Sequence, residues 1–265
     1  MRKASPVFLA AALLAQPAPA FAEDGVVLDD QGIKATGLDG EVSLHVGGKL
    51  HLDAVAVDDG AGGYDDAGVR RARLNLRLDY RDVLTLRAER EFAGSKGWRN
   101  LYAQLRPARG AVIQAGQFNV PFSLEDLQST NVIPFPERSL AAALTSEFGV
   151  GVMGGYGARR FTVRAGWFGD ALDTPAGPAP SLGRGLVGRA TVLAVDSGPA
   201  KLHLGLGLER RSFRAGEAVR YSADAGSSLG PRILRTPELG NLAHRTGYNA
   251  EIAFLRRKMA AIGLR

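Results

Sequence analysis

Arginines at alternate positions are the residues of this sequence whose type and spacing point most directly to a chemistry. Between residues 71 and 81 they occupy one phase, while Leu74, Leu76 and Leu78 occupy the other. A guanidinium group is planar and permanently charged, and its fork of donors binds phosphate-like oxyanions through paired hydrogen bonds. The pattern therefore predicts a positively charged face suited to anions. Across all the alternating stretches, the arginines assigned to this face are Arg71, Arg73, Arg77, Arg81, Arg87, Arg160, Arg164, Arg189 and Arg211.

The excess of arginine over lysine is weaker support for anion binding. The chain has 33 basic and 27 acidic residues and a formal charge of +6, of which Arg2 and Lys3 supply two. A GC-rich genome favours arginine over lysine everywhere, and the many alanines and glycines fit that explanation equally well. The direction in which the arginines point is therefore more informative than their number.

Other chemistries have little support in the sequence. The histidines His45, His51, His203 and His244 show no metal-ligand spacing, so no metal site is expected. Neither a G-x-S-x-G elbow nor a phosphate-cradling P-loop is present, and we expect no enzyme activity and no cofactor. Basic residues alternate with apolar ones and do not cluster on a tail, so no nucleic-acid partner is expected.

Strands are the elements that must position these side chains. Period-two alternation over residues 42–56 and 71–81 is typical of a strand with two different faces. A soluble sandwich would bury the apolar face, whereas a barrel in lipid would turn it to the acyl chains and the arginines to the lumen. Periodicity alone leaves both arrangements open. Ten strands are expected, near 42–56, 71–81, 83–92, 98–106, 111–119, 148–156, 161–168, 185–195, 201–213 and 247–254.

One long connection interrupts these strands. The strand that begins near residue 111 breaks at Pro121, because proline has no N–H for a ladder and fixes φ. Alternation resumes only after about Glu147. Connections of this length inside a β protein are uncommon and usually functional. We expect a barrel with this segment folded into its lumen.

The same segment resembles a known family, the phosphate-selective porins O and P. The run GQF at 116–118, the run PFSLE at 121–125 and the F-x-E-R pattern at 135–138 follow in that family's order and spacing. A weaker likeness extends from about residue 47 to 172. Asn119 departs from the pattern, because the family usually has a lysine there. The resemblance and the predicted export favour an all-β, antiparallel transmembrane β-barrel over the sandwich.

The resemblance implies passive, anion-favouring diffusion, with inorganic phosphate or polyphosphate as the substrate class. An inward row of arginines would collect anions, and the infolded loop would set the aperture. Arg138 is the candidate for the narrowest point; an ion pair between Glu137 and Arg138 that pins the loop to the wall is the competing interpretation. Outer-membrane lipid and, from the family's usual form, two further copies in a homotrimer are the expected partners. The expected anchors of the constriction loop are Phe118, Pro121, Phe122, Phe135 and Glu137.

The two ends of the chain carry separate expectations. Residues 1–22 read as a signal peptide with a charged start, a short apolar run and an Ala20-Phe21-Ala22 cleavage site, which predicts export to the outer membrane of a Gram-negative cell. The absence of cysteine suits that location. Residues 23–40 are expected to form a polar periplasmic leader, and residues 41–254 the barrel.

Residues 255–265 do not alternate and end in Arg265. We therefore expect an irregular, truncated C-terminus and a chain that holds the N-terminal part of a larger barrel; a complete small barrel of ten strands is an allowed even number and stays open. Two other functions stay open as well. One is a non-conducting structural or adhesive outer-membrane protein, and the other is a barrel fragment with no function of its own.

Overall fold

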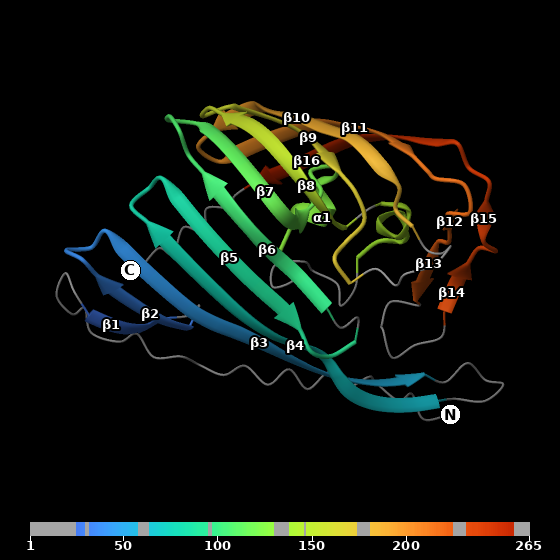
Figure 1. The fold of residues 1–265 in the computed structure, drawn as a ribbon, viewed down its shortest axis with the longest axis horizontal. Coiled ribbons are helices and arrows are strands. Elements are labelled where there is room, and N and C mark those ends of the chain that lie inside the picture. Colours follow the sequence, from blue (N-terminus) through green and yellow to red (C-terminus); the bar gives the residue numbers. More distant parts are fainter. Residues whose placement is uncertain are drawn as a thin grey trace, which may run out of the picture.

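The computed structural model describes residues 25–29, 32–57, 64–94, 97–129, 138–145, 147–173, 181–224 and 232–256. These residues form an almost entirely β structure (Figure 1). A 12-stranded antiparallel sheet follows the order of the chain from β1 to β11 and then β16. Its strands are β1 (Gly25–Asp29), β2 (Gly32–Gly37), β3 (Val42–Val57), β4 (Tyr64–Tyr80), β5 (Leu84–Glu91), β6 (Gly97–Leu105), β7 (Ala111–Asn119), β8 (Phe148–Gly157), β9 (Phe161–Phe168), β10 (Arg184–Ser197), β11 (Ala200–Ser212) and β16 (His244–Arg256).

The sheet curls into an arch, and β1 and β16 lie at the two ends of its hydrogen-bonded order in the part of the chain that the structure describes (Figure 1). The expected all-β, antiparallel fold is confirmed, and the sheet is not closed into a ring. Two small pairs, β12 (Ala218–Val219) with β15 (Leu239–Gly240) and β13 (Ser222–Asp224) with β14 (Arg232–Arg235), lie between β11 and β16 in sequence. Among the described residues, no helix has both the length and the apolar character needed to cross a membrane.

The two faces of the sheet follow the alternation of the sequence. The outward face is apolar and exposed, as Leu74, Val152, Leu206 and Ile252 show. The opposite face carries the buried polar and charged side chains, among them Glu89. A soluble sheet would bury its apolar face. An exposed apolar face and a polar interior are instead typical of barrel strands that face lipid on the outside.

The connection after β7 lies on the concave, polar side of the sheet. It contains α1 (Leu124–Leu127) and the 3₁₀ helix η1 (Leu140–Leu144), and α1 lies beneath the arch formed by β7 to β11 and β16 (Figure 1). We call residues 120–129 and 138–147 the pore loop. The side chain of Ser123 caps α1, accepting the N–H of Asp126 and donating its hydroxyl to the Asp126 carboxylate at 2.6 Å.

A small apolar cluster seats the pore loop on the wall. Phe118 meets Phe168 and Tyr102 edge-on, with ring centroids 5.3 and 5.9 Å apart. The expected anchors Phe118, Pro121 and Phe122 are all buried, the first and third within this cluster. The other two expected anchors, Phe135 and Glu137, lie outside the described residues.

All ten expected strands are present in the large sheet, and the structure adds β1 and β2 to it, besides the two small pairs β12–β15 and β13–β14. β1 and β2 form within residues 23–40, the expected polar leader, and β2 pairs with β3. Both strands are short and carry no clean alternation, so periodicity could not identify them. β4 begins at Tyr64, earlier than the strand expected at 71–81, and β16 runs to Arg256, which makes 255 and 256 strand residues. Residues 1–24 and 257–265 lie outside the described part.

Two of the expected arginines lie in turns. Arg81 lies in the turn between β4 and β5, with a φ of 48°, and Arg160 lies between β8 and β9. A further residue, Arg70, was assigned to no face. A β-bulge shifts the β3–β4 register between His51 and Leu52, which brings Arg70 to the same side as Arg71.

Candidate functional site

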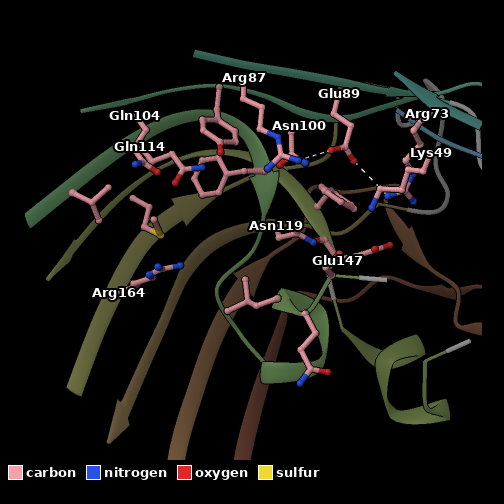
Figure 2. A pocket seen from close by; sticks show the side chains of 18 of the residues that line it. Lys49, Arg73, Arg87, Glu89, Asn100, Gln104, Gln114, Asn119, Glu147 and Arg164 are labelled. Carbon is pink, nitrogen blue, oxygen red and sulfur yellow. Dashed lines mark hydrogen bonds and ion pairs between the residues drawn. The ribbon is translucent and has the colours of Figure 1, made fainter. Parts of the chain in front are cut away.

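A polar cavity of about 310 Å³ lies between the inner wall of β3 to β9 and the pore loop. Figure 2 shows its lining side chains converging from the strands above and the loop below. Among the described lining residues, five side chains are cationic and two are carboxylates, and most of the others are neutral polar or aromatic. The cations are Lys49, Arg73, Arg87, Arg138 and Arg164, and the carboxylates are Glu89 and Glu147.

On the β4–β5 wall, carboxylates hold the arginines in fixed orientations. Arg73 donates its Nε to Glu91 at 2.5 Å and lies 3.4 Å from Glu89, and both Arg73 and Glu91 are nearly inaccessible to solvent. Arg87 donates to Glu89 at 2.6 Å and to the side-chain oxygen of Asn75 at 3.0 Å. Glu89 thus lies between two guanidinium groups (Figure 2). Such pairs, within β5 and across β4 and β5, orient the arginines without removing the positive excess of the cavity.

Arg164 differs from the other cavity arginines. It projects from β9, apart from the Arg73–Glu89–Arg87 group (Figure 2). No carboxylate among the described residues lies within ion-pair distance of it, and it lines a second cavity of about 390 Å³ next to the first. Its cross-strand neighbour on β10 is Arg189, which is paired instead with Glu251. Arg164 is therefore the cavity arginine best placed to meet a mobile anion.

Arg138 lines the cavity, but its donors are directed into the loop itself. Its Nη1 donates to Glu147 at 2.5 Å, and its Nε to the carbonyl of Glu125 at 3.0 Å. Its Nη2 donates to the carbonyls of Asp126 and Gln128 at 3.2 and 3.1 Å. A guanidinium group with four partners in one loop is a clamp, and this is closer to the pinning interpretation than to an anion contact. The partner is Glu147; Glu137 lies outside the described residues.

Two carboxyl groups of the pore loop have opposite electrostatic surroundings. Burial disfavours the charged form of Glu147, but Arg99 and Arg138 outweigh burial and hold the pKa of Glu147 below its ordinary value of 4.5. Burial raises the pKa of Asp126 above its ordinary 3.8, and the hydrogen bonds from Ser123 and Thr145 offset only part of that.

Asn119, the departure from the family pattern, lies at the base of the loop. Its side-chain amide donates to the carbonyls of Asp126 and Glu147 at 3.2 and 3.4 Å. It thereby joins the start and the end of the loop. An amide can do this because it carries two donors and no charge.

The remaining expected arginines lie outside the cavity. Arg77 and Arg81 line a separate polar hollow of about 890 Å³ near the β4–β5 turn, where they pair with Asp79 and Glu41. Arg71 lies 3.4 Å from His51. Arg160 is exposed. Arg211 is fully buried, donating to Glu209 at 3.0 Å and to the carbonyl of Gly183 at 3.2 Å.

Sequence reasoning left some members of the site unassigned. Lys49 has the inward phase on β3 but received no role, and Arg99 lies on β6 among polar residues without a run of arginines. Glu89 alternates along β5 as regularly as the arginines do, and Glu147 lies at the end of the loop, just before β8. Their partners became visible only when the strand register was known.

The comparisons with known proteins agree with this architecture. A search of curated proteins found no match. The model of the family described as phosphate-selective porin O and P matches residues 44–257, which include most of β3, the nine strands β4 to β11 and β16, and the whole pore loop. Such a family implies an outer-membrane channel for anions rather than an enzyme. The chain belongs to the phosphate-selective porin O and P family.

Proposed function

We propose that this chain lines an outer-membrane pore that passes small anions, phosphate among them, through the cavity between the β3–β9 wall and the pore loop. The observation that carries the proposal is the composition of that cavity, in which five cationic side chains face two carboxylates. A fixed excess of positive charge in a confined, low-dielectric space raises the local concentration of anions.

The arginines divide the path into stages. Arg77 and Arg81 line the hollow near the β4–β5 turn and present positive charge there. Arg73 and Arg87, held by Glu89 and Glu91, present oriented guanidinium groups farther in. There, charge-assisted hydrogen bonds would replace part of the hydration shell of an anion.

In this scheme Arg164 makes the principal contact with the anion, and Arg138 shapes the passage. A guanidinium group without a carboxylate partner can bind and release a passing ion, whereas one with four partners in the loop would have to break them. Residues Phe118, Pro121 and Phe122 keep the base of the loop on the wall through their burial. Assembly as a homotrimer stays a prediction, to be tested by the mass of the detergent-solubilised protein.

The test is conductance of the refolded chain in planar bilayers, with the zero-current potential in a chloride gradient and then with added phosphate. We expect an anion-selective potential and block by phosphate. Arg164→Ala should weaken the phosphate block by on the order of tenfold, because hydrogen bonds to charged groups contribute about that much. Arg159→Ala is the matched control, since Arg159 lies exposed in a turn and its only contact among the described residues is a long ion pair with Asp196 at 3.5 Å.

Cation selectivity, or the absence of channels from a folded sample, would overturn the proposal. An unchanged block in Arg164→Ala would remove Arg164 from the path while leaving the pore in place.

A further inference from the structure

Two glycines on β11 open a recess in the wall opposite the base of the pore loop. Gly205 pairs with Glu251 of β16, and Gly207 pairs with Asn249, while on the other side Gly207 pairs with Arg189 of β10. A Cβ at Gly205 would lie 2.2 Å from the Glu251 carboxylate. A Cβ at Gly207 would lie 2.2 Å from the carbonyl oxygen of Phe122, in the loop. Any side chain at either position would therefore displace what occupies the recess.

Glu251 fills this recess and connects three elements. Its carboxylate accepts the backbone N–H of Leu124 at 2.7 Å, at the start of α1. The same carboxylate pairs with Arg189 of β10, reaching across β11, and contacts the Nε2 of His203 at 3.0 Å. A nearly buried carboxylate with these partners has little freedom to move.

Asn249 adds a second contact to the same part of the loop. Its side-chain amide donates to the Phe122 carbonyl at 3.3 Å and to Glu251 at 3.2 Å. Two nearby loop positions, the carbonyl of Phe122 and the N–H of Leu124, are thus held by one strand. That strand lies 127 residues away in sequence.

The loop therefore has attachments on two sides of the arch. On one side, Asn119 and Arg138 tie it to itself and to the base of β8 through Glu147. On the other side, β11 and β16 hold it through Gly207, Asn249 and Glu251. Between these attachments the loop spans the concave side beneath β8 to β10 (Figure 1).

We propose that Glu251 is a positioning residue that, with Gly207 and Asn249, holds the far end of the pore loop on the β11–β16 wall and so sets the width of the anion cavity. We call these three residues the loop latch. The latch does not touch the anion. The effect of the latch on conduction rests on the proposed pore function, whereas the attachment of the loop to the wall does not.

Amide hydrogen exchange in residues 120–129 tests the latch without requiring conduction. Glu251→Ala removes the acceptor of the Leu124 N–H, and Gly207→Ala pushes on the Phe122 carbonyl without any change of charge. Glu251→Ala should speed exchange in that segment by on the order of tenfold, since a hydrogen bond to a charged group contributes about that factor to an opening equilibrium. Gly207→Ala should speed exchange in the same segment, because the added methyl group displaces the Phe122 carbonyl. Exchange in β5 should not change. Glu251→Gln, which keeps an acceptor but loses the charge facing Arg189, should give an intermediate rate.

Gly154→Ala is the matched control for Gly207→Ala. It places the same methyl group on a strand of the sheet, but nothing lies within 4 Å of it. Circular dichroism of each variant shows whether the sheet has formed, and if Glu251→Ala does not fold, Gly207→Ala carries the test alone.

Bilayer conductance of the same variants then reads the consequence for ions. We expect Glu251→Ala and Gly207→Ala to conduct more and to be blocked less by phosphate than the unsubstituted chain or Gly154→Ala. Unchanged exchange in residues 120–129 of folded Glu251→Ala and Gly207→Ala would overturn the latch, whatever the conductance. Faster exchange, with no conductance even from the unsubstituted chain, would uphold the latch and overturn the proposed pore.

Discussion

The two sides of the arch are built on different principles. On the β3–β6 side the inner face is a ladder of charges, in which Glu89 and Glu91 hold Arg73 and Arg87. On the β8–β11 side the inner face is rich in glycine, and a Cβ at Gly151, Gly166 or Gly207 would meet backbone within 2.5 Å. The first side supplies three of the five cationic side chains of the cavity, and the second, through Gly207, leaves room for the loop.

This difference shows how one sheet can both attract an ion and narrow its path. Charged side chains extend into the lumen and need partners to keep them in place. A loop folded inward needs a wall without side chains to lie against. The two requirements are met at different places in the chain: Arg73 and Arg87 of the charge ladder precede the loop, and Gly207, which the loop itself approaches, follows it.

The largest effect should come from breaking the charge ladder. Glu91→Ala removes the carboxylate that pairs with Arg73 and leaves the guanidinium group buried. Breaking a buried pair in this way lowers the free energy of unfolding by about 3 kcal/mol. Urea unfolding in detergent measures it. Glu41→Ala is the control, because Glu41 and Arg81 also lie 2.5 Å apart but are exposed. Equal losses in the two variants would show that burial does not distinguish the ladder from a surface pair.

A somewhat smaller effect is expected from the loop clamp. Arg138→Ala removes an ion pair and three hydrogen bonds to loop carbonyls. Because these bonds lie within the loop, we expect faster amide exchange in residues 138–145 and a larger conductance, with the unfolding of the sheet little changed. Arg159→Ala should alter neither quantity. A loss of conductance with preserved anion selectivity would instead mean that Arg138 contacts the ion directly.

Substitution of a glycine on the β8–β11 side by alanine tests whether close packing there requires glycine. Gly166→Ala puts a Cβ 2.5 Å from the carbonyl oxygen of Val152 and 2.9 Å from the Phe168 ring. Overpacking of this kind costs about 1–3 kcal/mol. Urea unfolding should show that loss, and it should show none for Gly154→Ala, which has open space. If Gly166→Ala is as stable as the control, the glycines are not required for packing.

The smallest expected effect is a pH dependence confined to the loop. Because burial raises the pKa of Asp126, its contribution to stability is complete below about 3.8 and is lost as pH rises through the raised value. Glu147 has the opposite sign: its lowered pKa contributes stability above 4.5 that is lost as pH falls through the folded value.

Above pH 4.5, therefore, acidification should slow exchange in residues 120–129 after correction for the intrinsic rate. Asp126→Asn should abolish that slowing, because the amide does not titrate. If the slowing persists in Asp126→Asn, another group in the loop is responsible for it.

Alternation was sufficient to predict ten strands and their outward faces, because lipid on one side and a polar lumen on the other impose a strict period of two. It failed where that period is absent or interrupted. β1 and β2 are too short to show a period of two. The bulge opposite His51 places Arg70 on the same side as Arg71, although strict alternation would place the two on opposite faces. Arg81 and Arg160 continue the alternation by one residue into turns.

The site was predictable in composition but not in its pairing. Phase identified Arg73, Arg87 and Arg164 as inward, and the cavity contains all three. Which arginines are held by acids depends on neighbouring strands and on their register, which no single strand reveals. Arg138 was expected at the aperture, yet its partners are mostly backbone carbonyls, and backbone carbonyls have no signature in a sequence.

The separation of 127 residues between Leu124 and Glu251 also has a consequence in time. Contacts between distant parts of a chain form late, because the closure entropy of the long intervening segment must be overcome first. The loop can fold against its own base as soon as β7 and β8 pair, but its far end has nothing to bind until β16 is in place. We therefore expect the passage to take its final width in one of the last steps of folding, after the wall that surrounds it.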